Sequence, residues 1–404
     1  MSKTLLIIGA GREQIPAYEL AHEMGLTVVG TDMTADAPAL AFADHQLIAS
    51  TRDAEATWAA VKEFSKTHAI DGVITIANDV PYTVALVASN LGLPSISPQS
   101  AKYFMNKIEM KKCFLEHGVK TPEYREIPDL DSFKLGLAEM SFPLIIKPSD
   151  GRGSRGVLYL DQSIDPNWAY EHALASCDNG VLILEKFIEG PQLSVEGLFV
   201  DEKYYAIAFA DRNYSNLEQT RPFIVEDGGQ IPSHYGDDTL DAINKLIQDG
   251  AKALGISWGT VKADIVIGPD GPEIIELAGR LSGNYLATHH IPMAYGVDIV
   301  GALINMSIGN SVAPEYVTPK HKKYMGVRYF FPEQGTIKAI TGVDAVRSQP
   351  YINMLDIFPK VGDIQTAIDN HGARAGTIIC EGDNYEMAKA RVEQAVNDIK
   401  FVVE

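Results

Sequence analysis

The sequence lacks any apolar run that approaches the roughly 18 residues needed to cross a membrane, and its first apolar run ends at Gly9. We therefore expect neither a membrane span nor a signal peptide. Cysteine is scarce: Cys113, Cys177 and Cys380 are far apart and show no CxxC or Cys/His spacing. Neither a disulfide framework nor a zinc site is predicted, and the reducing cytoplasm is the expected compartment.

Basic residues are also few, because 34 Lys and Arg stand against 53 Asp and Glu and give a formal net charge of −19. An extended nucleic-acid surface needs clustered Lys and Arg, so the charge argues against such a partner. Scattered basic residues in an acidic chain are better suited to a small anionic ligand.

The 404 residues are enough for two or three domains. Residues 4–95 alternate strand and helix patterns, which predicts a parallel α/β sheet, with a helix over 81–91 and a short strand over 93–95. From about residue 100, strands separated by turns rich in Gly, Asp and Pro predict antiparallel α+β structure. We expect three domains, over residues 1–100, 101–309 and 310–404.

A glycine turn follows the first predicted strand. Gly9 and Gly11 begin a dinucleotide-binding pattern, but Gln14 stands in the place of the third glycine. Asp32, after the second predicted strand, is placed like a ribose-binding acid. The motif indicates either a nicotinamide site or, in our preferred interpretation, a tight strand–helix turn that binds no dinucleotide.

A second motif joins a lysine to a flexible loop. The strand 144–147 ends at Lys147 and is followed by the loop Asp150–Gly156, which is rich in glycine and serine. Backbone N–H groups of such a loop can approach a polyphosphate closely while the lysine contributes a point charge. A flexible hairpin without a ligand is the alternative.

A third motif, over residues 182–196, is a strand, a short connector and another strand. Its connector can present backbone N–H and C=O groups to the edge of a purine, and Gln192 can reach ribose hydroxyls.

In the fourth motif, a turn at 268–271 joins two strands and places Asp264 opposite Glu276, with Arg280 four residues later. Paired carboxylates suit a hard cation, and the arginine can grip a phosphoryl group or a carboxylate. Solvated acids on a hairpin are the alternative.

These stretches, in this order, resemble the ATP-grasp superfamily, and the resemblance extends over essentially the whole chain. It implies a Rossmann-like pre-ATP-grasp domain, an ATP-grasp fold and a C-terminal α+β lobe. Residues 98–122 look like the family's helical start, in which Lys107 matches the first phosphate-binding lysine. Ala278 is a departure, because many members have a metal-binding Asn there.

The resemblance also implies a role for each matching residue, with residues 150–156 as the mobile lid. The implied ATP-binding residues are Lys107, Lys147, Gly151, Gly153, Ser154, Gly156, Glu185, Lys186, Phe187, Ile188 and Gln192. The implied metal ligands, for Mg²⁺ or Mn²⁺, are Asp264 and Glu276. The residues implied in the chemical step are Lys147, Lys262 and Arg280.

Within the superfamily, the chain is similar to carboxylate–amine ligases related to L-amino-acid ligases and to carbamoyl-phosphate-synthase-like proteins. This implies that a small carboxylate is activated by ATP as an acyl phosphate and attacked by an amine. The alternatives are an ATP-grasp carboxylase, a carbamoyl-phosphate-type phosphotransferase, a non-catalytic ATP-binding regulator and a dinucleotide-dependent oxidoreductase. No nucleic-acid or membrane partner is expected, and a homodimer stays open.

Substrate contacts are the least determined part of the site. His289 and His290 are adjacent and point in different directions on a helix or strand, so they are predicted to be a surface pair. The candidates for substrate contact are Arg12, Gln14, Asn78, Asp79, Arg212, Asn213 and residues 282–284.

Overall fold

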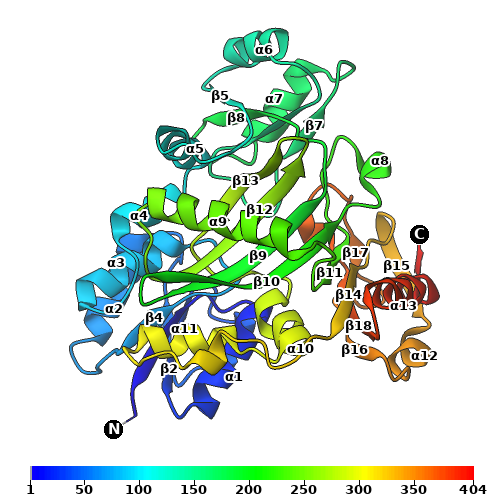
Figure 1. Cartoon of the computed structure of the whole chain (residues 1–404). Helices are drawn as coiled ribbons and strands as arrows, with labels where there is room; N and C mark the ends of the chain where they lie inside the picture. Colours follow the sequence, from blue (N-terminus) through cyan, green and yellow to red (C-terminus); the bar gives the residue numbers. More distant parts are fainter. Residues whose placement is uncertain (1) are drawn as a thin grey trace.

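The computed structural model describes residues 2–404 and contains four sheets (Figure 1). A parallel sheet near the N-terminus is followed by a small and a large antiparallel sheet, and a three-stranded sheet lies near the C-terminus. The predicted combination of α/β and α+β structure is confirmed.

The N-terminal sheet has the order β3-β2-β1-β4, and its strands are parallel. The strands are β1 (Thr4–Ile8), β2 (Thr27–Asp32), β3 (His45–Ile48) and β4 (Gly72–Ile74), and the helices are α1 (Ile15–Glu23), α2 (Ala54–Phe64) and α3 (Pro81–Leu91). Leu6 and Ile7 of β1 are both fully buried because each face of the sheet packs against apolar residues. The prediction of a helix over 81–91 is confirmed.

Two predictions for this region need correction. Residues 93–95 are irregular rather than a strand, because Gly92 ends α3 in the left-handed conformation. The edge strand β3 was missed, since none of its residues is fully buried and it carries no clear apolar alternation.

The small sheet has the order β5-β8-β6-β7 and all its pairs are antiparallel. Its strands are β5 (Tyr124–Ile127), β6 (Leu144–Pro148), β7 (Leu158–Leu160) and β8 (Leu182–Lys186), and its helices are α6 (Leu130–Glu139) and α7 (Pro166–Leu174). Leu144 and Ile146 pack in one core with both helices. Because side chains alternate along a strand, Ile145 and Lys147 project from the opposite face.

Two helices precede the small sheet, α4 (Pro98–Tyr103) and α5 (Lys107–Glu116). Asn106 caps α5, since its side chain accepts from the N–H groups of Ile108 and Glu109. The cap fixes where α5 begins and places Lys107 at its first position.

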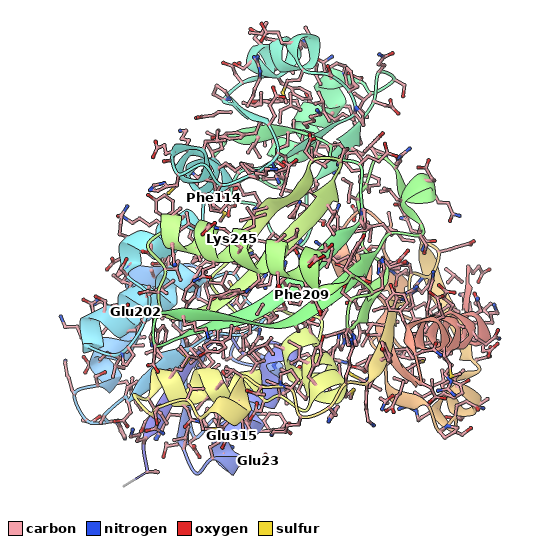
Figure 2. All side chains as sticks on the ribbon, in the orientation of Figure 1. Glu23, Phe114, Glu202, Phe209, Lys245 and Glu315 are labelled. Carbon is pink, nitrogen blue, oxygen red and sulfur yellow. The ribbon has the colours of Figure 1, made fainter. Side chains whose placement is uncertain are left out.

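The large sheet has the order β13-β12-β9-β10-β11-β14-β18-β16. Its first five strands are β9 (Gln192–Val200), β10 (Lys203–Asn213), β11 (Gly228–Ile231), β12 (Gly259–Gly268) and β13 (Gly271–Ala278), and a short helix α8 (Leu217–Thr220) follows β10. The long helix α9 (Asp237–Ala253) crosses one face of the sheet (Figures 1 and 2). Its Ile243 and Ile247 are fully buried among side chains of the sheet. Residues of α10 (Ile291–Tyr295) and α11 (Ile299–Ser307) share a core with the N-terminal sheet and the other face.

The C-terminal part extends the large sheet. Strands β14 (Tyr324–Tyr329), β16 (Ile352–Ile357) and β18 (Gly376–Gly382) continue it beyond β11. The helix α13 (Tyr385–Asp398) packs against β14 and β18, and α12 (Val343–Arg347) packs against β16. The three-stranded sheet is formed by β15 (Gly335–Thr341), β17 (Ile364–Gln365) and β19 (Lys400–Val403). At the junction, an added Cβ at Gly228 would collide with the Val327 carbonyl oxygen, and one at Gly229 with that of Asp211. The division of the chain near residues 100 and 309 stays a prediction.

Candidate active site

A cavity of about 400 Å³ lies where the N-terminal loops, the small sheet, the large sheet and the C-terminal segment meet. The structure brings to its wall every residue predicted for ATP binding, metal binding or the chemical step except Gly156. Gly156 instead packs against α7, because an added Cβ there would lie 3.0 Å from the Ala173 carbonyl oxygen. Among the candidate substrate contacts, Asp79, Arg212 and residues 282–284 line the cavity, whereas Arg12, Gln14, Asn78 and Asn213 do not.

Lys147 belongs to a buried cluster of three charges. Its Nζ lies 2.7 Å from Glu185 Oε2 on β8, and Lys111 Nζ of α5 lies 3.3 Å from Glu185 Oε1. Burial disfavours the ionised carboxylate, but the two lysines outweigh it and lower the pKa of Glu185. Burial also lowers the pKa of Lys111 to about 8, against the opposing effect of Glu185.

This cluster changes the interpretation of two residues. Glu185 was grouped with the purine-binding stretch, yet its carboxylate is occupied by two lysines. Lys111 was not singled out from the sequence, although its spacing of four residues from Lys107 places both lysines on one face of α5. Lys111 also donates to Thr121 Oγ1 at 2.5 Å.

The connector after β8 also lines the cavity. The N–H groups of Lys186 and Phe187 donate to the carbonyls of Glu123 and Pro143 at 2.9 and 3.1 Å. These two N–H groups are therefore already used, and a ligand at residues 186–188 would contact other backbone and side-chain groups of the connector. Gln192 lies on β9, where its Oε1 accepts from Tyr214 at 3.0 Å.

Lys107 reaches from the start of α5 to the glycine-rich loop. Its Nζ donates to the Gly151 carbonyl oxygen at 2.7 Å and lies 3.1 Å from Glu276 Oε1. One lysine thus contacts both the loop and a carboxylate on the large sheet.

Asp264 and Glu276 are direct partners across β12 and β13, as the hairpin predicts. Asp264 Oδ1 lies 2.5 Å from Lys262 Nζ and 3.0 Å from Arg212 Nη1. Burial opposes ionisation, but Lys262 and Arg212 outweigh it, so the pKa of Asp264 lies well below its ordinary value. The ionised Asp264 and the Glu276 carboxylate therefore stand side by side on the cavity wall.

A metal at this place would have two protein ligands. Within residues 2–404 no group of three or more His, Cys, Asp and Glu side chains could hold a metal ion. Oxygen ligands on facing strands suit Mg²⁺, which commonly keeps several waters and binds substrate phosphates. The donor set of Asp264 and Glu276 fits that coordination.

Arg280 is held from the N-terminal sheet. Its Nε donates to Asp79 Oδ1 at 2.7 Å, and the segment after it forms a parallel bridge between Leu281 and Ile76. The buried Glu196 accepts a hydrogen bond from the Ser282 N–H, two residues after Arg280. Burial raises the pKa of Glu196 to about 7. Asp79, a candidate substrate contact from the sequence, lies against this arginine and also lines the cavity.

The C-terminal segment supplies residues to the cavity that carried no signal in the sequence. The Cζ atom of Arg374 lies 3.8 Å from the centre of the Tyr329 ring. Its Nη2 donates to the Glu226 carbonyl oxygen at 3.1 Å. His371 contacts the glycine-rich loop.

The sequence assigned His289 and His290 to the surface, and this is wrong for His290. It is 4% exposed and lines the cavity, and burial lowers its pKa to about 3. Residues 286–290 form a π-helical segment that follows Tyr285, whose φ is 60°.

The side chain of Asp32 forms hydrogen bonds with backbone N–H groups of the glycine turn and of its own loop. Asp32 Oδ2 accepts from the Ala10 N–H at 3.1 Å, and Oδ1 accepts from the Thr34 N–H at 3.1 Å. The carboxylate that would receive a ribose therefore stabilises the turn. Gly9, Gly11 and Asp32 do not line the cavity.

Comparisons with known proteins give three matching family models. Residues 104–284 match the ATP-grasp domain, residues 18–95 the ATP-grasp N-terminal domain, and residues 328–404 the L-amino acid ligase C-terminal domain 2.

Two relatives are similar to this chain over most of its length. Alanine–anticapsin ligase of Bacillus subtilis is 23% identical over 349 residues, which cover 77% of this chain and 70% of that protein. An uncharacterised protein of Sinorhizobium fredii is 24% identical over 345 residues, which cover 84% of this chain and 69% of that protein. The crystal structure of L-amino acid ligase from Bacillus licheniformis aligns over 100% of this chain and 99% of that one, with a TM-score of 0.84 and 21% identity. That likeness establishes the fold.

Proposed function

Because the chain belongs to the ATP-grasp superfamily, we propose that it is a ligase that uses ATP to join a carboxylate to an amine. An oxygen of the substrate carboxylate attacks the γ-phosphorus, and the bond to the bridging oxygen of ADP breaks. The amine nitrogen then attacks the acyl carbon, loses a proton and displaces phosphate.

The nucleotide is proposed to lie between the small sheet and the large sheet. Lys107 and Lys147 neutralise phosphate oxygens, and the loop 150–156 covers them with backbone N–H groups. Glu185 holds Lys147 in place rather than contacting adenine. The purine is assigned to the connector 186–188 and the ribose to Gln192.

The carboxylates on the large sheet are proposed to hold Mg²⁺, or Mn²⁺. Such an ion, when bound, neutralises charge on the β- and γ-phosphates. Asp264 and Glu276 would be its protein ligands, and Lys262 and Lys107 beside them limit the negative charge of the site. Water and phosphate oxygens would take the place of the side chain that Ala278 lacks.

Arg280 is assigned to the reacting groups. Its guanidinium is fixed through Nε by Asp79, and it holds the carboxylate and then the tetrahedral intermediate as negative charge develops. Loop closure keeps water from the acyl phosphate.

The observation that carries the proposal is the convergence of Lys107, Lys147, the glycine-rich loop and the Asp264–Glu276 pair on one cavity. The test is ADP and phosphate release with Mg·ATP and pools of small carboxylates and amines. We expect release that needs both a carboxylate and an amine, and a higher melting temperature with Mg·ATP but not with NADPH. Stabilisation by NADPH alone, without ATP turnover, would support the oxidoreductase instead.

The compartment and assembly are part of the proposal. No helix within residues 2–404 is long and apolar enough to cross a membrane. We propose a cytoplasmic protein with a homodimer as the assembly to test, by light scattering.

A further inference from the structure

The glycine-rich loop contacts the C-terminal segment at its tip. Ser154 Oγ lies 3.1 Å from His371 Nε2, and the His371 N–H donates to the Gly153 carbonyl oxygen at 3.2 Å. Lys107 holds the loop from another side through Gly151. The loop is therefore fixed between a lysine assigned to phosphate and a histidine that is 217 residues away from Ser154.

The direction of the hydrogen bond follows from a second neighbour. The Glu226 N–H, which can only donate, points at His371 Nε2 from 3.5 Å. Nε2 is then the unprotonated nitrogen, and its single lone pair is shared between the Glu226 N–H and the Ser154 hydroxyl, which donates from the shorter distance of 3.1 Å. Burial and the nearby Arg374 and Arg212 hold the pKa of His371 well below its ordinary value, so the ring is neutral.

His371 is carried by a well-anchored segment. Gln365 Nε2 donates to the Ala373 carbonyl oxygen at 2.7 Å, and Asn370 Oδ1 accepts from the Gly372 N–H at 2.7 Å. These bonds hold both sides of the histidine. The segment can serve as a fixed surface against which the loop closes.

The same segment is connected to the carboxylate pair. Arg374 donates to the Glu226 backbone, and the Glu226 carboxylate lies 2.7 Å from Arg212. Arg212 in turn lies 3.0 Å from Asp264. A continuous set of contacts thus joins the loop to the residues assigned to the metal.

Resting on the proposed function, we propose that His371 is a positioning residue that fixes the glycine-rich loop over the bound nucleotide by accepting a hydrogen bond from Ser154. Closure of the loop then depends on the C-terminal lobe. Without this bond, the loop opens more often and water reaches the acyl phosphate before the amine does.

Trypsin provides a direct readout because Arg152 and Arg155 lie within the loop. The probe is Mg²⁺ with the β,γ-imido analogue of ATP, and cleavage at these two sites is followed by mass spectrometry. We expect the analogue to protect the wild type, and His371→Ala to lose this protection about fivefold, as one hydrogen bond of ordinary strength implies. His371→Gln, whose amide oxygen can accept near the position of Nε2, should restore part of the protection.

Ser154→Ala tests the other partner and does not disturb the C-terminal segment. It should match His371→Ala, and the double variant should lose little more than either single variant. His68→Ala, at an exposed position of the N-terminal region, is the control. A second readout is the number of ADP molecules formed per ligated product, which should rise in both single variants.

The outcomes separate the two proposals. Protection of the wild type with equal protection of His371→Ala and Ser154→Ala overturns the role of His371 and leaves the ATP site intact. Absence of protection in the wild type overturns the nucleotide site and this inference with it. Loss of protection in both variants with unchanged melting temperatures supports the inference.

Discussion

Asp79 and Arg280 are 201 residues apart in sequence, yet Arg280 Nε donates to Asp79 Oδ1 at 2.7 Å. Burial would raise the pKa of Asp79, but Arg280 outweighs it and lowers that pKa, so the acid is ionised. The loop after β4 therefore contributes a charge that fixes an arginine in the segment after β13.

Asp79→Asn should reduce kcat by about 10- to 100-fold, because Arg280 loses the charge that fixes its guanidinium while its own charge remains. The KM for ATP should change little, since the phosphates are assigned to Lys107 and Lys147. The measurement is steady-state ADP formation with Asp36→Asn, an exposed acid of the same region, as control. An unchanged kcat in Asp79→Asn would show that Arg280 does not depend on this pair.

Lys147→Ala should reduce turnover at least about 100-fold through loss of charge near the phosphates. It should also lower the free energy of unfolding by about 1–3 kcal/mol, because buried Glu185 keeps only Lys111. Adding Glu185→Gln should restore part of the stability and none of the turnover. Urea unfolding and ADP release measure the two effects, with exposed Lys134→Ala as control. Wild-type turnover in folded Lys147→Ala would contradict the phosphate assignment.

Asp264→Asn and Glu276→Gln should each raise the Mg²⁺ concentration needed for activity and lower kcat, because the two carboxylates stand opposite each other in the hairpin. The double variant should lose much less than the product of the single effects, since the pair acts as one unit. A Mg²⁺ titration of ADP formation measures this, and Asp270→Asn at the exposed hairpin turn is the matched control. Multiplicative losses would indicate two independent acids.

Glu196 gives a prediction for the effect of pH on stability. Burial raises its pKa from 4.5 to about 7, so between these values the folded chain binds more protons than the unfolded chain. The contribution of Glu196 to stability is therefore full below pH 4.5 and is lost as the pH rises through 7. Glu196→Gln should match the wild type at pH 4 and exceed it by up to about 3 kcal/mol at pH 8. Urea unfolding at both pH values tests this, and an equal difference at the two values would refute it.

Local patterns in the sequence predicted the parts of the fold that depend on local spacing. The helix over 81–91, the Asp264–Glu276 register and the lysine followed by a glycine-rich loop all lie within short segments. The spacing of apolar residues and the residue types in the turns are sufficient to predict such features.

Contacts between distant segments could not be derived in this way. The histidine at 371 and the acid at 79 reach the cavity only because three sheets meet there, and neither stands in a motif. Glu185 shows the same limit within a motif, because its side chain could only be assigned once Lys111 was placed beside it.

The junction between β11 and β14 restricts how lobes can be exchanged between relatives. Gly228 and Gly229 leave no room for a side chain against the Val327 and Asp211 carbonyls, and β11 pairs with strands on both sides. In a chimaera that joins residues 1–309 to another protein's C-terminal lobe, the first strand of the new lobe must pair with β11 in the same backbone register as β14 does. A suitable junction at residue 309 is not sufficient. The transferable unit therefore includes a strand that lies about 80 residues before the cut.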